Sequence, residues 1–196
     1  AFGAAGDGSV TVTPAQRNDV ALLGVAVQPD GRILVAGFAS LGVSGRSDMM
    51  VARFLADGAL DTSFAGGAGM ATFDFGTWND AASRVLVQAD GRLLLAGRVG
   101  NNASNGDPTD FAVLRLTAAG QIDTAYGSNG WARANVAGGY DVPRGAVLTA
   151  DGGVVLAGRV ASSGGANGDV GLVKFTAAGQ PDSAFGANGN GTVRIN

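Results

Sequence analysis

The sequence predicts an all-β protein made of three four-stranded repeat units of about 61 residues each. Three observations support this prediction: a composition rich in turn residues, a threefold recurrence of several segments, and evenly spaced hairpin signals. The 196-residue chain contains 34 glycines and 16 acidic residues, all of them aspartate, but only one lysine. Glycine and aspartate favour turns, whereas the absent glutamate and the rare lysine favour helices. The composition therefore indicates strands joined by short turns.

Three segments recur in the same order along the chain. LDTSF at residues 60–64 returns as IDTAY at 122–126 and as PDSAF at 181–185. An Asp-Gly or Asp-Gly-Arg turn and a short apolar segment recur in phase with it, at residues 30–31, 90–91 and 151–152 and at residues 51–54, 113–116 and 172–175. Such self-similarity at a fixed period is typical of repeat architectures.

The second copy shows how a unit divides into strands. Its alternating and apolar runs predict strands over residues 70–75, 84–88, 92–96 and 111–117. The Asp-Gly pair between the middle two predicts a type I′ hairpin turn, in which both central residues have positive φ. The unbroken apolar run at residues 93–95 indicates a strand buried on both faces, and hence a stack of sheets.

The two ends of the chain carry the same segment. Phe2-Gly3 has the phase of Phe185-Gly186, and SVTV at residues 9–12 matches TVRI at residues 192–195. One strand is therefore supplied twice, and thirteen strands are predicted in all. The predicted organisation is a single repeat domain over 1–196, with an N-terminal edge strand at 1–12 and repeats at 13–75, 76–136 and 137–196.

These motifs resemble the delta-60 repeat, a tandem module of bacterial proteins that are often secreted or attached to the cell surface. The resemblance is carried by DGRILVAG at residues 30–37, VARF at 51–54 and LDTSF at 60–64, and it spans nearly the whole chain. The chain departs from the pattern at Ala65, where the other copies have glycine, and at Lys174, where they have arginine. The resemblance implies a β-propeller-like fold and no defined activity.

Three units are too few to close a propeller, because propellers usually need about four to eight blades. We therefore expect a homo-oligomer, for example two chains that together supply six blades, with the terminal strands making the subunit contact. A β-trefoil or β-prism, which closes three units within one chain, is the alternative. A strand that is supplied twice favours assembly.

The composition excludes several functions. Without histidine or cysteine the chain holds no Ser-His-Asp triad, no thiolate nucleophile and no usual zinc site. A net charge of −3 and scattered arginines do not predict nucleic-acid binding, and the apolar runs are far shorter than the ~20 residues of a membrane span. Because the chain begins with alanine and lacks cysteine, we expect an extracellular or cell-surface protein whose signal peptide has been removed.

Structural ion pairs are expected in each unit. Arg53, Arg115 and Lys174 lie among apolar residues within strands, where an unpaired charge would be costly. Their predicted partners are the recurring acids Asp61, Asp123 and Asp182, with Asp48, Asp110 and Asp169 as the alternative set. Because aspartates recur in all copies, we interpret them as structural rather than catalytic.

Ligand binding is better sought where the copies differ. The long loop of the second copy offers oxygen ligands for calcium or partners for sugar hydroxyls, namely Asn101, Asn102, Asn105, Asp107 and Asp110. Three aromatic residues that break the repeat, Trp78, Trp131 and Tyr140, could stack on sugars or anchor a partner. A solvated loop and core packing, respectively, are the structural alternatives.

We therefore predict a non-catalytic extracellular β-repeat protein that acts by self-assembly or by binding a surface partner such as a glycan or a cell-surface protein. One alternative is a lectin-like carbohydrate-binding module, with or without calcium. Another is a glycosidase with a carboxylate pair drawn from Asp7, Asp57, Asp74 and Asp107, the acids that do not recur in all copies. No other cofactor is expected.

Overall fold

Twelve strands in three antiparallel sheets make up the part of the chain that the computed structural model describes, residues 2–3, 6–12, 19–40, 46–76, 80–100, 108–161 and 168–196. Sheet 1 contains β1 (Asp19–Val27), β2 (Ile33–Ser40), β3 (Ser47–Phe54) and β4 (Met70–Phe73). Sheet 2 contains β5 (Ala81–Val87), β6 (Leu93–Gly100), β7 (Thr109–Leu116) and β8 (Trp131–Ala134). Sheet 3 contains β9 (Val142–Leu148), β10 (Val154–Val160), β11 (Asp169–Phe175) and β12 (Thr192–Ile195). A short 3-10 turn, η2 (Ala65–Gly67), precedes β4.

Each sheet is a simple meander in which the strands pair in chain order. The hairpins between the first two strands differ from the predicted type I′ turns. Gly31 has a φ of 83°, but Asp30 is not among the described non-glycine residues with positive φ. Gly31 N donates to Gln28 O, and Gln28 N donates to Arg32 O, so the loop has three residues, with a type I turn followed by a left-handed glycine. The type I′ prediction is therefore wrong here, although the glycine is needed.

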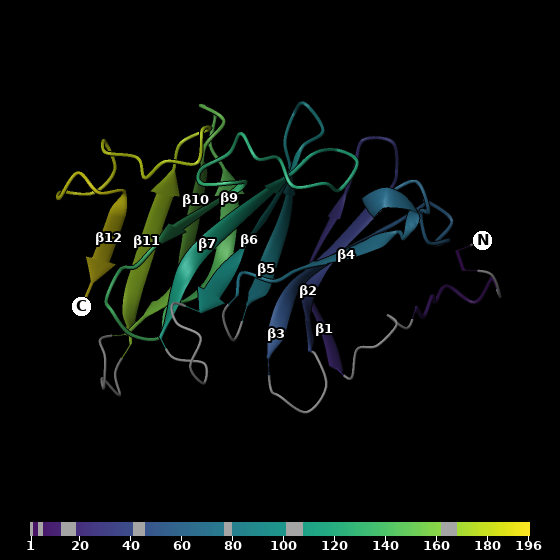
Figure 1. The fold of residues 1–196 in the computed structure, drawn as a ribbon, viewed down its shortest axis with the longest axis horizontal. Helices are drawn as coiled ribbons and strands as arrows, with labels where there is room; N and C mark the ends of the chain where they lie inside the picture. Colours follow the sequence, from purple (N-terminus) through teal and green to yellow (C-terminus); the bar gives the residue numbers. More distant parts are fainter. Residues whose placement is uncertain are drawn as a thin grey trace.

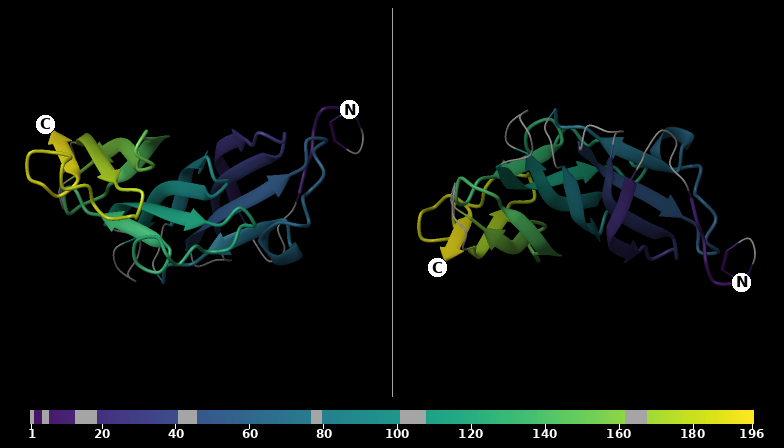
Figure 2. Two further views of the ribbon diagram at one scale, coloured as in Figure 1. Left: turned by 90° about the horizontal axis from the view of Figure 1, so that it is seen from above. Right: turned by 90° about the horizontal axis from the view of Figure 1, so that it is seen from below.

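The three sheets lie side by side in an open row, with sheet 2 in the middle (Figures 1 and 2). One apolar core lies between sheets 1 and 2 and includes Leu34, Met49, Leu95 and Leu114. A second core lies between sheets 2 and 3 and includes Leu94, Phe111, Leu156 and Val173. Successive residues of β6 thus enter different cores, which explains the unbroken apolar run in the sequence. The row is not the closed threefold arrangement of a trefoil or prism.

Two strands differ from their predicted places. The strand predicted at 70–75 as part of the second copy pairs with β3 as the last strand of sheet 1, and β8 takes the corresponding place in sheet 2. Residues 9–12, predicted as an edge strand, belong to no strand. They lie instead against sheet 1, where Val10, Thr11 and Val12 line a cavity of about 280 Å³ together with residues of β1 to β4. Sheet 1 already has its four strands, so this segment covers a face rather than extending an edge.

Candidate functional site

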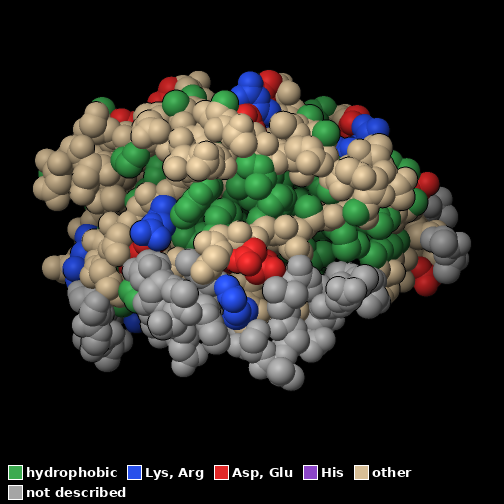
Figure 3. Space-filling model, viewed as in Figure 1, with side chains coloured by type: hydrophobic (Ala, Val, Ile, Leu, Met, Phe, Trp, Pro, Cys, Tyr) green, Lys and Arg blue, Asp and Glu red, His purple; other side chains and the backbone are tan. Residues whose placement is uncertain are grey.

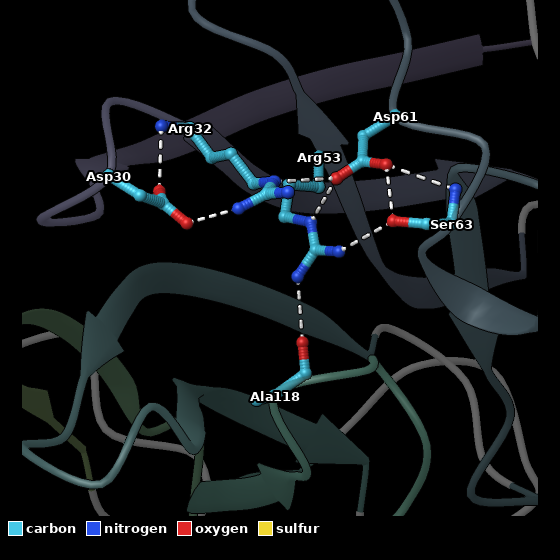
Figure 4. A network of polar contacts seen from close by, with 6 residues as sticks. All are labelled: Asp30, Arg32, Arg53, Asp61, Ser63 and Ala118. Atoms are coloured by element: carbon cyan, nitrogen blue, oxygen red, sulfur yellow. Dashed lines mark hydrogen bonds and ion pairs between the residues drawn. The ribbon is translucent and has the colours of Figure 1, made fainter.

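A charged cluster lies where sheet 1 meets sheet 2 (Figure 4). Arg53 on β3 is buried, and its Nε lies 2.7 Å from a carboxylate oxygen of Asp61. Its Nη2 donates to the Ser63 hydroxyl at 3.3 Å, and its Nη1 donates to the carbonyl oxygen of Ala118, in the turn after β7, at 2.7 Å. One guanidinium therefore joins a turn of its own unit to the next unit.

Asp61 anchors this cluster as an anion at neutral pH. Its carboxylate accepts hydrogen bonds from the hydroxyl and the backbone N–H of Ser63, at 2.6 Å and 3.0 Å, and it also lies 3.1 Å from Arg32 Nε. The bonds from Ser63, together with the Arg53 charge, lower the pKa of Asp61 to about 2. Arg32 is in turn paired with Asp30 at the hairpin turn.

An aromatic ring packs on a glycine at the same contact. The Arg53 guanidinium lies 4.5 Å from the ring centroid of Phe64, which is fully buried. The ring covers Gly120 so closely that a Cβ there would lie 2.5 Å from Phe64, and the Gly120 φ of 83° also disfavours other residues. Beside it, Ala65 N donates to Ala119 O at 2.8 Å. We call this set of contacts, an aromatic ring on a glycine with an adjacent amide-to-carbonyl bond, the aromatic–glycine joint.

The joint recurs between sheets 2 and 3. Tyr126 covers Gly179, and Gly127 N donates to Ala178 O at 2.9 Å. Arg115 lies 2.9 Å from Asp123, 4.6 Å from the centroid of the Tyr126 ring, and donates to Ala177 O at 2.9 Å. The same geometry thus connects both pairs of neighbouring sheets.

The third unit carries the first half of a joint. Lys174 takes the place of the arginine, and its Nζ lies 2.7 Å from Asp182 and 2.9 Å from Asp151. Phe185 corresponds to Phe64 and Tyr126 but is only half-buried. Within the described residues no further sheet follows Phe185.

Asp80 and Asp141 connect neighbouring sheets at the ends of the strands opposite to the aromatic–glycine joints. Asp80 N donates to Ser47 O at 3.0 Å, and its carboxylate accepts the backbone N–H groups of Phe75 and Gly100 at 3.3 Å and 3.0 Å. Asp141 makes the equivalent contacts one unit later, and burial raises its pKa. The sequence did not indicate that Asp80 and Asp141 connect neighbouring sheets, because their hydrogen-bond partners come from different units.

One group of carboxylates has the spacing of a metal site. Oxygens of Asp48, Asp74 and Asp80 lie within 4.8 Å of one another. Both Asp80 oxygens already accept backbone N–H groups, so we interpret the group as structural. The calcium ligands proposed from the sequence are different residues.

The residues suggested for ligand binding separate into two groups. Trp78, Asn101, Asn102, Asn105 and Asp107 lie outside the described residues. The others are described and occupy packing positions.

Asp110, Trp131 and Tyr140 each have partners within the fold. Asp110 is fully buried, 3.2 Å from Arg133 Nε, and Asp169 pairs in the same way with Arg194. Trp131 is half-buried, with its ring centroid 4.9 Å from that of Phe75. Tyr140 is half-buried and bridges to Thr109 of β7. Hydrophobic side chains gather over β7 and β4 on the face shown in Figure 3, with charged side chains around them.

The remaining carboxylates proposed for a glycosidase lie in turns. Each of three accepts a hydrogen bond from the backbone N–H two residues further on, at 2.7 to 2.9 Å: Asp7 from Ser9, Asp57 from Ala59 and Asp74 from Gly76. Asp107 lies outside the described residues. A hollow of about 500 Å³ between Trp131, Arg133 and Gln180 has no carboxylate among the described residues that line it.

Comparison with known families gives one match. A family model described as "Domain of unknown function (DUF5122) beta-propeller" matches residues 28–64 and 88–126. Each matched segment runs from the first hairpin turn of a unit to the aromatic residue of its joint. A comparison with the curated proteins gives no match. The chain is thus similar to a β-propeller-like repeat family, in agreement with its three four-stranded sheets.

Proposed function

We propose that this chain is a non-catalytic β-repeat module that acts by binding at the outward faces of its two terminal sheets, through self-assembly or through a surface partner. The observation that carries the proposal is the apolar character of these faces. On sheet 3, Val170 is 53% exposed, whereas Phe111, at the equivalent position of sheet 2, is 0% exposed. On sheet 1, Val25 is 68% exposed, whereas its counterpart Val85 is 3% exposed. The terminal sheets therefore present the surface that sheet 2 buries on both sides.

Self-assembly is the mode that we favour, because a sheet with this pattern is complementary to another sheet of the same kind. Two chains would provide six sheets, within the range of closed propellers. The resemblance to the delta-60 repeat supports a role outside the cell or at its surface. The turn and ion-pair roles of the described carboxylates support a function without catalysis or a bound cofactor. Among the described residues, no helix has the length and apolar character to cross a membrane.

Sedimentation velocity of the full chain over a range of micromolar concentrations tests the proposal. We expect the weight-average sedimentation coefficient to rise with concentration. Val170→Asp should abolish this rise without lowering the melting temperature, because it places a charge on the outward face. Ile122→Asp, at an exposed apolar residue in the connection between β7 and β8, is the matched control and should leave association unchanged. A chain that stays monomeric throughout this range would contradict self-assembly.

A further inference from the structure

The N-terminal segment, residues 2–3 and 6–12, repeats the segment from Phe185 to Ile195 in sequence, and the two segments share the conformation of their turns. Gly3 and Gly186 have φ values of 81° and 82°. Each lies so close to a carbonyl, that of Ser9 or that of Thr192, that neither could carry a side chain without rearrangement. The turns that follow are also alike. Asp7 accepts the N–H and the hydroxyl of Ser9, both at 2.9 Å, just as Asn190 accepts those of Thr192 at 3.1 Å and 2.9 Å.

The N-terminal segment contacts the turn after β3 of sheet 1 in the way that the end of a preceding unit would. A Cβ on Gly58 would lie 3.0 Å from the Phe2 ring, and Gly3 N donates to Asp57 O at 2.7 Å. These are the contacts of Phe64 with Gly120 and of Ala65 with Ala119 at the first joint. Val10 and Val12 continue over the outward face of sheet 1. Within the part of the chain that the structure describes, the segment thus forms a third aromatic–glycine joint to which no further sheet is attached.

The opposite end of the chain carries the complementary half. Phe185 and Gly186 have the conformation of a joint. They belong to the unit that contains sheet 3, whose outward face is exposed. Asp57 adds a carboxylate to the turn whose glycine the ring covers, where the two internal joints have alanine. Lys174 supplies a cation in the unit that provides the ring. These charges are complementary. In both internal joints a basic side chain also donates to the turn that carries the covered glycine.

We propose that the end of sheet 3 of one copy docks on the Asp57-Gly58 turn of a second copy, and that residues 2–3 and 6–12 form an intramolecular cap that must leave this turn first. The proposal rests on the self-assembly proposed above and adds where it occurs and what limits it. Phe185 takes the place of Phe2, and Gly186 N donates to Asp57 O of the second copy. Only one such segment fits at a joint, so the cap and the incoming end compete.

Competition predicts opposite effects from two equivalent substitutions. Phe2→Ala weakens the cap and should strengthen association, whereas Phe185→Ala weakens the incoming end and should reduce association. Both rings are only half-buried, so we expect both variants to fold. Because the two effects are independent, the double variant should associate more strongly than Phe185→Ala and more weakly than Phe2→Ala.

Sedimentation equilibrium of the full chain and these three variants measures the effects. We expect Phe2→Ala to lower the dissociation constant and Phe185→Ala to raise it, each by at least about tenfold, since aromatic anchors dominate such contacts. Equal association of Phe2→Ala and the unmodified chain would overturn the cap while leaving self-assembly intact. Unchanged association in Phe185→Ala would overturn the docking site. A monomer in every variant would overturn both this inference and the self-assembly itself.

Crosslinking then locates the contact, because the chain has no cysteine of its own. At the first joint, Arg53 contacts both Ser63 and Ala118, which correspond to Ala184 and Ala56. A mixture of Ala184→Cys and Ala56→Cys chains, both in the Phe2→Ala background, should give a heterodimer with a short bismaleimide. Each chain alone should not, and an equal yield from either chain alone would contradict the head-to-tail contact.

Discussion

Replacing Arg115 by methionine tests whether the aromatic–glycine joint holds the sheets together. Arg115 is buried on β7, pairs with Asp123 at 2.9 Å and donates to Ala177 O of the next unit at 2.9 Å. Methionine keeps the apolar contact with Tyr126 but removes both polar contacts. Asp123 then keeps only the more distant Arg92, at 3.4 Å, as a charged partner.

The expected cost follows from these losses. Breaking a buried pair costs about 3 to 5 kcal/mol, but the remaining contact with Arg92 reduces this, so we expect a loss of about 2 to 4 kcal/mol in the free energy of unfolding. Urea denaturation followed by circular dichroism measures it from the midpoint and the slope. Arg92→Met, at a position whose side chain is 42% exposed, is the matched control and should cost less than about 1 kcal/mol. Equal stabilities of the two variants would refute the structural role of Arg115.

Three further predictions address the joint and the core. Gly120→Val should lower the free energy of unfolding by at least about 3 kcal/mol, since its side chain meets Phe64 and its φ is positive; a normal melting temperature would contradict the joint geometry. Because the pKa of Asp61 is lowered to about 2, its stabilisation is present above about pH 4 and is lost as the pH falls toward 2. Asp61→Asn should show a weaker pH dependence of unfolding in that window, and an unchanged dependence would count against the cluster. Leu94→Ala should cost about 2 to 5 kcal/mol in a urea titration, against less than about 1 kcal/mol for the exposed Ile195→Ala, and similar values would argue against the second core.

The sequence predicts the architecture well because each unit repeats the same local signals. The apolar runs mark β2, β6 and β10, and the recurring turn residues separate them from their neighbours. The class of the hairpin turn was not predictable in this way. An Asp-Gly pair indicates a turn, but the pairing of Gln28 with Arg32 decides that three residues form the loop.

Alignment of the copies also misplaces one residue. Asp19 matches Asp80 in the sequence, yet Leu22 pairs with Gly37 where Ala82 pairs with Gly97. This register places Val20, not Asp19, at the position of Asp80. Both strands carry a bulge at the same place, so the difference comes from one extra residue between Asp19 and Asp30 compared with the span from Asp80 to Asp90.

The ion pairs are predictable from burial and charge within one unit, whereas the joint is not. Arg53 needs a carboxylate because it lies among apolar residues, and Asp61 is a near neighbour in the chain. The contacts with Gly120 and Ala118 depend on how two units stack. The recurrence of this turn glycine at residues 58, 120 and 179 is the signal that the sequence offers, but its role depends on the aromatic rings that cover it in the folded chain.

Small-angle X-ray scattering of the monomeric chain at low concentration tests the open row of sheets most directly. A compact chain of this length has a radius of gyration of about 16 Å. The structure predicts a clearly larger value and an asymmetric distance distribution with a long tail, because the three sheets extend in one direction (Figure 2). A radius near the compact value with a symmetric distribution would show that the three units close on themselves and would contradict the account.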